Sequence, residues 1–226
     1  MTQVDIKTRS IRSFVKRSGR ITPAQRNAIE SHWKNYGFDF NEAYIDIPPG
    51  YSGVKLEIGI GNGDALISMA SADPDNLYIG IEVHEPGIGR CLNNAKQQGL
   101  ENLRLISHDA IEVLQHMIRP QSLQQVMLFF PDPWHKKRHH KRRIVNADFR
   151  DLLDNCLQPG GRFHAATDWQ DYAEHIAAEF LMDARFENLG DDEGYAPCPQ
   201  YRPATRFQQR GIRLGHGVWD LIFVKK

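Results

Sequence analysis

The sequence predicts an α/β fold in which a mostly parallel sheet carries helices on both faces. Short apolar runs alternate along the chain with segments of helical periodicity, and several apolar runs end in glycine or acidic residues. Strands that alternate with helices are typical of βαβ units, which place successive strands parallel and side by side. With 226 residues, 41% of them hydrophobic, the chain is large enough to bury the core of one domain.

The first half of the chain alternates short apolar runs with helical patterns. The runs are rich in Ile and Leu, as buried strands are: VKLEIGI (54–60), NLYIGIE (76–82) and NLRLISH (102–108). The helical patterns lie at 65–72, 87–99 and 110–118. Gly99 ends the second of these helices, because glycine is a preferred residue just past a helix C-terminus.

The second half continues the alternation and adds a final strand after an Arg-rich loop. The expected strands are QVMLFF (125–130), RFHAAT (162–167) and GVWDLIFVKK (217–226). The expected helices are 146–157, closed by Pro159-Gly160-Gly161, and 171–181. No internal repeat or second domain is evident, so residues 31–226 are expected to form one domain. Residues 1–30 have little apolar periodicity and are expected to form a basic, flexible tail.

The formal net charge of zero hides a strong segregation of charge. Residues 1–26 carry a net charge of +6 and residues 133–143 another +6, which leaves −12 on the remainder. Two basic segments on an acidic body indicate a partner with regularly spaced negative charge, such as a nucleic acid. The alternatives are a solvated surface for either segment and, for the start of the chain, a mitochondrial targeting sequence.

Cysteine, histidine and hydropathy patterns exclude several classes of protein. No apolar run approaches the roughly 20 residues of a membrane span, so no membrane association is expected. Cys91, Cys156 and Cys198 show no paired spacing, and the ten His are scattered apart from one basic run. We therefore expect neither disulfides nor a metal site. A location in the reducing cytoplasm is expected instead.

A glycine-rich turn follows the first expected strand in the segment EIGIGNGDA. It contains Glu57, Gly59, Gly61 and Gly63, and glycines here let the backbone turn sharply and approach a ligand. The dinucleotide fingerprint requires a sixth-position glycine, where this chain has Asp64 or Leu66 depending on the starting glycine. The pattern favours a smaller, cationic cofactor without phosphate, with a purely structural turn as the alternative.

Acidic residues also follow the next two expected strands. Glu82, after the second, can accept hydrogen bonds from ribose hydroxyls, and Asp109, after the third, can accept one from an adenine amino group. Ligands of such sheets bind beyond the carboxyl ends of the strands. The acids and the glycine turn together fit S-adenosylmethionine, which combines adenine, ribose and a sulfonium.

The fourth strand leads directly into Pro131-Asp132-Pro133-Trp134. The prolines restrict the backbone and hold Asp132 in one orientation beside the expected cofactor. Trp134 can stack on a base or anchor the loop by packing. The next nine residues, 135–143, are all Lys, Arg or His, which is typical of a phosphate-binding strip.

These segments resemble the bacterial tRNA (guanine-N7-)-methyltransferase family. The resemblance extends over most of the chain, through the following segments: RSFVKRSGRITPAQ, LEIGIGNGD, IGIEVH, SHDA, FFPDPWHKKRHHKRR, ATDWQDYAEH and TRFQQRG. It implies a Rossmann-like class I S-adenosylmethionine-dependent methyltransferase with a seven-stranded sheet. It also implies methylation of guanine N7 at position 46 in the tRNA variable loop. No obligatory protein partner is inferred, and both monomer and homodimer remain open.

The resemblance also implies roles for individual residues. The cofactor-binding residues would be Glu57, Glu82, Asp109 and Asp132, with Asp132 also at the catalytic centre, and the glycine turn adds Gly59, Gly61 and Gly63. The substrate-binding residues would be Lys136, Asp168, Thr205, Arg206, Phe207 and Gln208. From the basic run itself, the expected RNA-binding residues are Arg138, His139, His140, Lys141, Arg142 and Arg143. Gln208 departs from the family, which usually has Glu there. Asp168 can alternatively cap the helix that follows it.

Three other functions remain open at the level of sequence. An exocyclic-amine methyltransferase has an Asp-Pro-Pro-aromatic motif after its fourth strand, and this chain lacks the second proline. A nicotinamide-dependent oxidoreductase is disfavoured by the incomplete glycine fingerprint. A non-catalytic RNA-binding module would explain the basic segments but not the acids after three successive strands.

Overall fold

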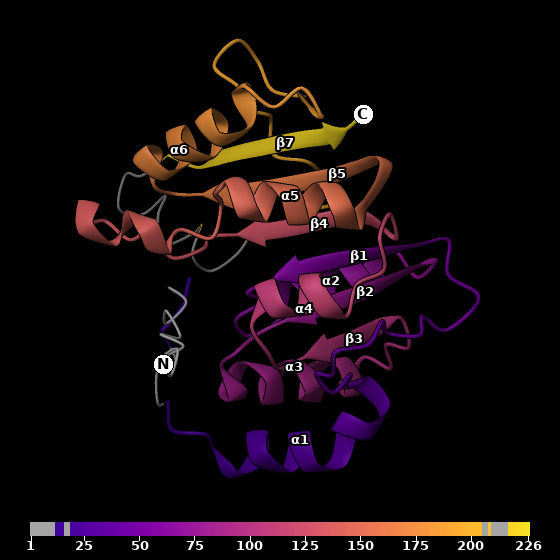
Figure 1. Cartoon of the computed structure of the whole chain (residues 1–226). Helices are drawn as coiled ribbons and strands as arrows, with labels where there is room; N and C mark the ends of the chain where they lie inside the picture. Colours follow the sequence, from indigo (N-terminus) through magenta and orange to yellow (C-terminus); the bar gives the residue numbers. More distant parts are fainter. Residues whose placement is uncertain (1–11, 16–18, 205–207, 209–216) are drawn as a thin grey trace, which may run out of the picture.

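Seven strands of the described chain form one sheet in the order β3-β2-β1-β4-β5-β7-β6 (Figure 1). The computed structural model describes residues 12–15, 19–204, 208 and 217–226. β7 runs antiparallel to both β5 and β6, and the other neighbouring strands are parallel. The strands are β1 (Gly53–Ile58), β2 (Asn76–Ile81), β3 (Leu103–Ile106), β4 (Leu123–Phe129), β5 (Leu157–Thr167), β6 (Phe186–Asn188) and β7 (Trp219–Lys225). The predicted mostly parallel α/β architecture is confirmed.

Helices cover both faces of this sheet, as predicted. They are α1 (Pro23–Tyr36), α2 (Asp64–Ala72), α3 (Glu85–Gln97), α4 (Ala110–His116), α5 (Ala147–Cys156), α6 (Gln170–Leu181) and the 3-10 helix η1 (Lys137–Arg142). Buried side chains of α4, α5 and α6 pack on one face, and those of α2 and α3 pack on the other. In Figure 1, α1 lies beyond α3 as an outer layer. Among the described residues, no helix has the length and apolar character that a membrane crossing requires.

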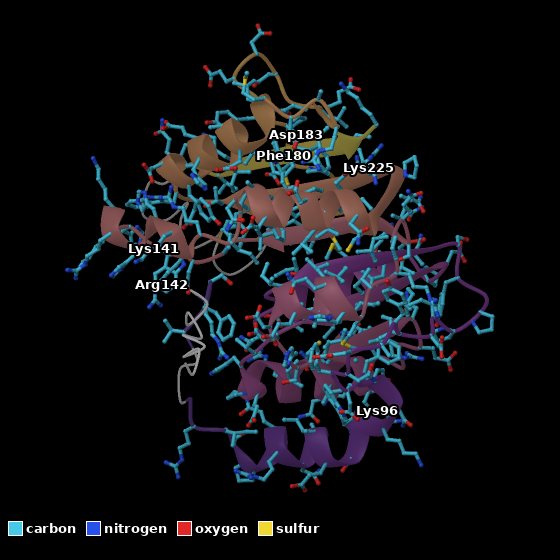
Figure 2. All side chains as sticks on the ribbon, viewed as in Figure 1. Lys96, Lys141, Arg142, Phe180, Asp183 and Lys225 are labelled. Atoms are coloured by element: carbon cyan, nitrogen blue, oxygen red, sulfur yellow. The ribbon has the colours of Figure 1, made fainter. Side chains whose placement is uncertain are left out.

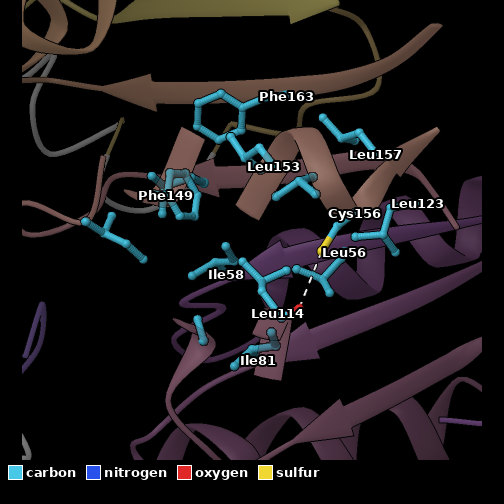
Figure 3. Close-up of a cluster of buried hydrophobic side chains, with 14 of the residues drawn as sticks. Leu56, Ile58, Ile81, Leu114, Leu123, Phe149, Leu153, Cys156, Leu157 and Phe163 are labelled. Carbon is cyan, nitrogen blue, oxygen red and sulfur yellow. Dashed lines mark hydrogen bonds between the residues drawn. The ribbon is translucent and has the colours of Figure 1, made fainter. Parts of the chain in front are cut away.

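The larger of the two hydrophobic cores packs α5 against the central strands of the sheet (Figure 3). Phe149 and Leu153 of α5 pack with Leu56 and Ile58 of β1, and all four side chains are at most 5% exposed. Burying a side chain of this size contributes about 1.5–3 kcal/mol. Movement of β1 would expose several of these side chains at once, so the loops at its carboxyl end have a fixed base.

α1 was not predicted, because only Ala28 and Tyr36 are buried and the apolar periodicity is weak. Its start is nevertheless encoded locally. The Thr22 hydroxyl accepts from Gln25 N and the Gln25 side chain accepts from Thr22 N, a capping box with Pro23 at the first helical position. Gly89 lets α1 approach α3, because a Cβ there would lie 2.5 Å from the Gln25 carbonyl oxygen. The predicted boundary at residue 30 falls inside this helix, which packs on α3.

Smaller differences concern the second half of the sheet. β5 begins at Leu157, so Pro159–Gly161 lies within this strand, where the pairing with β4 shifts register. Gly160 has a φ of 76°, which only glycine adopts readily, so the segment predicted to close a helix forms an irregular strand instead. The short edge strand β6 was not predicted.

Candidate active site

A cavity of about 460 Å³ opens at the carboxyl ends of β1, β2 and β4. In the strand order, β1 lies between β2 and β4. The connection from β1 to β2 and the connection from β3 to β4 therefore lead to opposite sides of β1, and a crevice opens where they diverge. The wall includes the turn after β1, Glu82 and His84 after β2, and the loop of residues 130–132 after β4. Residues 13–15 also line it, although the sequence predicts a flexible tail there. This is the binding position that the sequence predicted for a ligand.

The glycine turn presents its backbone to this cavity. Gly59 and Gly61 have φ values of 74° and 56°, and a Cβ on either would meet no described atom within 4 Å. Gly63 also has a positive φ of 77°, and a Cβ there would lie 2.3 Å from Cys91 Sγ on α3. All three glycines therefore allow the conformation, and the third also allows α2 to pack closely on α3.

Glu57 carries an unpaired buried carboxylate oxygen at the cavity wall. The residue is 3% exposed, and its Oε2 has no hydrogen-bond partner among the described residues. Burial, with the nearby negative charge of Glu82, raises the pKa of Glu57 to about 8. Since leaving such an acceptor unsatisfied is costly, the position is suited to a ligand that brings a donor or a positive charge.

Glu82 is held by three backbone amides. Its Oε1 accepts from Val83 N at 2.7 Å and His84 N at 3.0 Å, and its Oε2 accepts from Gly61 N at 2.8 Å. Two carboxylate oxygens offer about four acceptor positions, so these bonds leave room for about one more. Glu82 thus connects the β2 end to the glycine turn and can accept from one ribose hydroxyl without losing an amide.

Asp109 begins α4 rather than facing the cavity directly. Its Oδ1 accepts from Ile111 N at 3.0 Å, and its neighbours His108 and Ala110 line the cavity. Burial raises the pKa of Asp109 above its ordinary value. A helix-capping function accounts for this acid, and its predicted contact with adenine stays a prediction.

The loop after β4 combines a strained backbone with an exposed carboxylate. Phe130 and Trp134 have φ values of 50° and 53°, which are uncommon for large side chains. Asp132 lies between them, is exposed, and lines the cavity. Such strain persists only where neighbours fix the backbone, so the loop is held in the conformation that presents Asp132.

Arg143 is one of the neighbours that fix this loop, and it is buried although the sequence places it in a basic run expected to be exposed. The residue is 3% exposed, and its Nε donates to the Pro133 carbonyl oxygen at 3.0 Å. Its guanidinium also pairs with Asp171 and lies over the Tyr172 ring, 4.9 Å from the centroid. A guanidinium buried in this way supports the loop, and its predicted contact with RNA stays a prediction.

The rest of the basic run forms an exposed surface on η1. Lys136, Lys137, Arg138 and Lys141 are exposed, and His139, His140 and Arg142 are half-buried. Figure 2 shows Lys141 and Arg142 on the side of the molecule remote from Lys96. These side chains extend from the loop that carries Asp132, so a polyanion bound to them would pass close to the cavity.

Trp134 packs within the protein. Its Nε1 donates to the Ser13 carbonyl oxygen at 3.2 Å, and the Arg142 guanidinium lies 4.9 Å from the ring centroid. His139 meets the ring edge-on at 6.0 Å. These contacts favour the loop-packing interpretation over base stacking.

The remaining predicted substrate residues are described only in part. Asp168 follows β5 and lies one residue before the N-cap position of α6, which Trp169 occupies without a capping hydrogen bond from its side chain. Gln208 accepts a hydrogen bond from Arg202 at 2.7 Å. Thr205, Arg206 and Phe207 lie outside the described residues. Within the described ranges, no cluster of three or more His, Cys, Asp or Glu side chains is arranged to hold a metal ion.

Sequence comparison places these features in a known family. A family model described as "Putative methyltransferase" matches residues 52–221. The tRNA (guanine-N(7)-)-methyltransferase of Escherichia coli strain K12 is 51% identical over 218 residues, or 95% of this chain and 91% of the relative. The tRNA (guanine-N(7)-)-methyltransferase of Salmonella typhimurium strain LT2 has the same identity and coverage.

Solved structures share the fold at low identity. A variant of the 16S rRNA (adenine(1408)-N(1))-methyltransferase of Catenulisporales acidiphilia, with its cosubstrate SAM, has a TM-score of 0.52 and 17% identity. The alignment covers 80% of this chain and 92% of that one. A SAM-dependent O-methyltransferase of Thermotoga maritima has a TM-score of 0.51 and 16% identity, over 92% of this chain and 67% of that one.

These likenesses show the Rossmann-like methyltransferase fold alone, whereas the close sequence relatives show the family. About half of the residues are identical over nearly the whole chain, and the family model covers all seven strands except the end of β7. The chain therefore belongs to the tRNA (guanine-N(7)-)-methyltransferase family.

Proposed function

We propose that this protein transfers a methyl group from S-adenosylmethionine to N7 of guanine 46 in the variable loop of tRNA, in the cytoplasm. The observation that carries the proposal is one cavity that joins three features. They are the unpaired buried carboxylate of Glu57, the open backbone of the glycine turn, and the exposed Asp132 from which the basic surface extends. The close relatives, named for this reaction, support it.

The residues of the cavity fit S-adenosylmethionine. Its cationic groups suit the Glu57 carboxylate, and its ribose hydroxyls suit the remaining acceptor position of Glu82. The positive φ of Gly59 and Gly61 leaves the space above the turn open to a ligand. When bound, the cofactor supplies an activated methyl group on a sulfonium.

Methylation of guanine N7 requires little acid–base chemistry from the protein. N7 has an in-plane lone pair and no proton, so no general base is needed. Positive charge develops on the imidazole ring during transfer, and a fixed carboxylate next to the base stabilises it. Asp132 has the required position, because it lines the cavity on a restrained loop. By the resemblance to the family, Asp168 and Gln208 would hold the other edge of the guanine.

The exposed cations of η1 account for tRNA binding. Lys137, Arg138 and Lys141 can each neutralise a phosphate, and Lys136 lies closest to Asp132 in the chain. Binding of this kind places the RNA without reading its sequence. Choice of the guanine then depends on the cavity and on the segment that contains Gln208.

Incubation with labelled S-adenosylmethionine and unmodified tRNA, followed by nucleoside identification, tests the proposal. The expected product is 7-methylguanosine at position 46. Methyl groups on an exocyclic base amine would favour the related amine methyltransferases. RNA binding without any methyl transfer would favour a non-catalytic module. A tRNA with adenine at position 46 is the matched control and should remain unmethylated.

A further inference from the structure

A buried polar network connects β4, β5 and β7 to the loop that precedes Gln208. His164 of β5 and Asp220 of β7 are 0% and 3% exposed, and their Nε2 and Oδ1 atoms are 2.7 Å apart. Arg202 donates to the same carboxylate from Nε at 2.6 Å and from Nη2 at 2.8 Å. Tyr201 lies 2.8 Å from His164 Nδ1 and accepts from Gln125 of β4 at 2.9 Å.

The charges in this network are matched. The ionised Asp220 carboxylate can only accept, so His164 donates to it from Nε2, and in the neutral ring Nδ1 accepts from the Tyr201 hydroxyl. Burial also lowers the pKa of His164. Burial acts to raise the pKa of Asp220, but hydrogen bonds from His164 and Arg202 lower it. The network therefore contains one buried carboxylate and one buried guanidinium, in a bidentate pair.

Arg202 extends from this pair toward the proposed active site. Its Nη1 donates to Gln208 Oε1 at 2.7 Å. The guanidinium also lies 6.0 Å from the Phe129 ring centroid and 5.7 Å from that of Phe130. Phe130 has a positive φ and stands two residues before Asp132. The Arg202 side chain thus contacts both Gln208 and the start of the loop that carries Asp132, and both would border the guanine.

We propose that Arg202 is a positioning residue for methyl transfer. Anchored on Asp220, its guanidinium fixes Gln208 and the Phe130 stem of the loop that carries Asp132. Lysine cannot replace it, because an ammonium lacks the planar set of donors that serves Asp220 and Gln208 at once. This inference rests on the proposed function.

Arg202→Lys and the matched control Arg150→Lys provide the first test. Arg150 pairs with Glu179 and Asp183 outside the cavity wall, so its replacement by Lys likewise weakens the contacts of a partly buried guanidinium. We expect Arg202→Lys to lower kcat about 10²-fold by misplacing the reacting groups, with cofactor affinity unchanged. Arg150→Lys should lower Tm without lowering kcat.

A double-mutant cycle separates positioning from a general loss of structure. Gln208→Ala should lower kcat/KM for tRNA in the wild type and much less in the Arg202→Lys background, because Gln208 is then already misplaced. Equal losses in both backgrounds, or normal kcat in Arg202→Lys, would overturn the inference. Wild-type protein without N7 methylation would instead refute the proposed function.

Variants of Gln208 keep the test valid if Arg202→Lys does not fold. Gln208→Glu retains an acceptor for Arg202 and should lower kcat/KM for tRNA less than Gln208→Leu, which removes the acceptor and should lower kcat/KM about tenfold, an ordinary effect of one lost contact between coupled residues. Cofactor affinity should be the same in both. Full activity in Gln208→Leu would show that the Arg202 contact positions nothing.

Discussion

Arg143 donates a hydrogen bond from Nε to the carbonyl oxygen of Pro133, 3.0 Å away. The end of the basic run is thereby joined to the loop that carries Asp132. Because the same guanidinium pairs with Asp171 and covers the Tyr172 ring, α6 also helps to set the shape of this loop. Of two adjacent arginines, Arg142 lies against Trp134 near the surface and Arg143 supports the proposed catalytic loop.

Arg143→Lys should therefore impair catalysis rather than RNA binding. Lysine cannot contact Pro133, Asp171 and the Tyr172 ring together, so Asp132 should shift, and kcat should fall about 10²-fold. The salt dependence of tRNA affinity should stay the same, because Arg143 is buried. Single-turnover rates and filter binding over a salt series measure the two effects. A flattened salt slope with normal kcat would show that Arg143 contacts phosphate.

The exposed cations of η1 should behave in the opposite way. Replacing Lys137 and Lys141 together with Ala should weaken binding to all tRNAs alike, because counterion release is independent of sequence. The plot of log affinity against log salt should flatten by roughly 0.7–0.9 per lost contact. Cofactor affinity without RNA should not change.

Lys34→Ala with Lys96→Ala is the matched control for this pair. Both lysines are exposed, on α1 and α3, and Figure 2 shows Lys96 far from Lys141. The control should leave the salt slope as it is in the wild type. A selective loss for one tRNA in the η1 variant would indicate base readout instead.

The fold was largely predictable because each central strand is a short apolar run bounded by glycine or acid. α1 was missed since tertiary packing on α3, not periodicity, stabilises it, although Thr22, Pro23 and Gln25 encode its start. β6 has three residues, of which only Phe186 is buried, so the sequence pattern is too short to recognise.

The part of the candidate site that could be predicted from the sequence consists of residues that directly follow a strand. Glu57, Glu82 and Asp132 line the cavity because the carboxyl ends of β1, β2 and β4 meet there. Individual members of a uniform run were not predictable, because composition does not show that Arg143 turns inward. Arg202 was also missed: its partner Asp220 is on a strand that reaches it only through the sheet topology.

Asp132→Asn should abolish most methyl transfer while the protein stays folded. The amide keeps the shape of the side chain and removes the negative charge, so the loss of kcat should be about 10²–10³-fold. Tm should be unchanged, because Asp132 is exposed and contributes little to the core. Asp75→Asn, an exposed change in the turn before β2, is the control and should retain full activity. Near-normal turnover would remove Asp132 from the mechanism.

Glu57 should make the stability of the cofactor-free protein depend on pH. Its pKa is raised from 4.5 to about 8 in the folded state, so the folded protein binds the proton more tightly than the unfolded chain. The free energy of unfolding contributed by Glu57 is therefore fully present below pH 4.5 and is lost as the pH rises through about 8. Between pH 4.5 and about 8, the Tm of Glu57→Gln should fall less than the Tm of the wild type. Glu30→Gln, at an exposed position on α1, is the control and should match the wild type.

The same proton should be released when S-adenosylmethionine binds. A cationic ligand favours the ionised carboxylate, so cofactor affinity should rise with pH up to about 8. Titration calorimetry at pH 6.5 in buffers of different ionisation enthalpy measures the protons released. We expect close to one proton for the wild type and for Glu30→Gln, and none for Glu57→Gln, which should also bind more weakly. Equal proton release in Glu57→Gln and the wild type would show that another group titrates, and that Glu57 does not meet the positive charge of the cofactor.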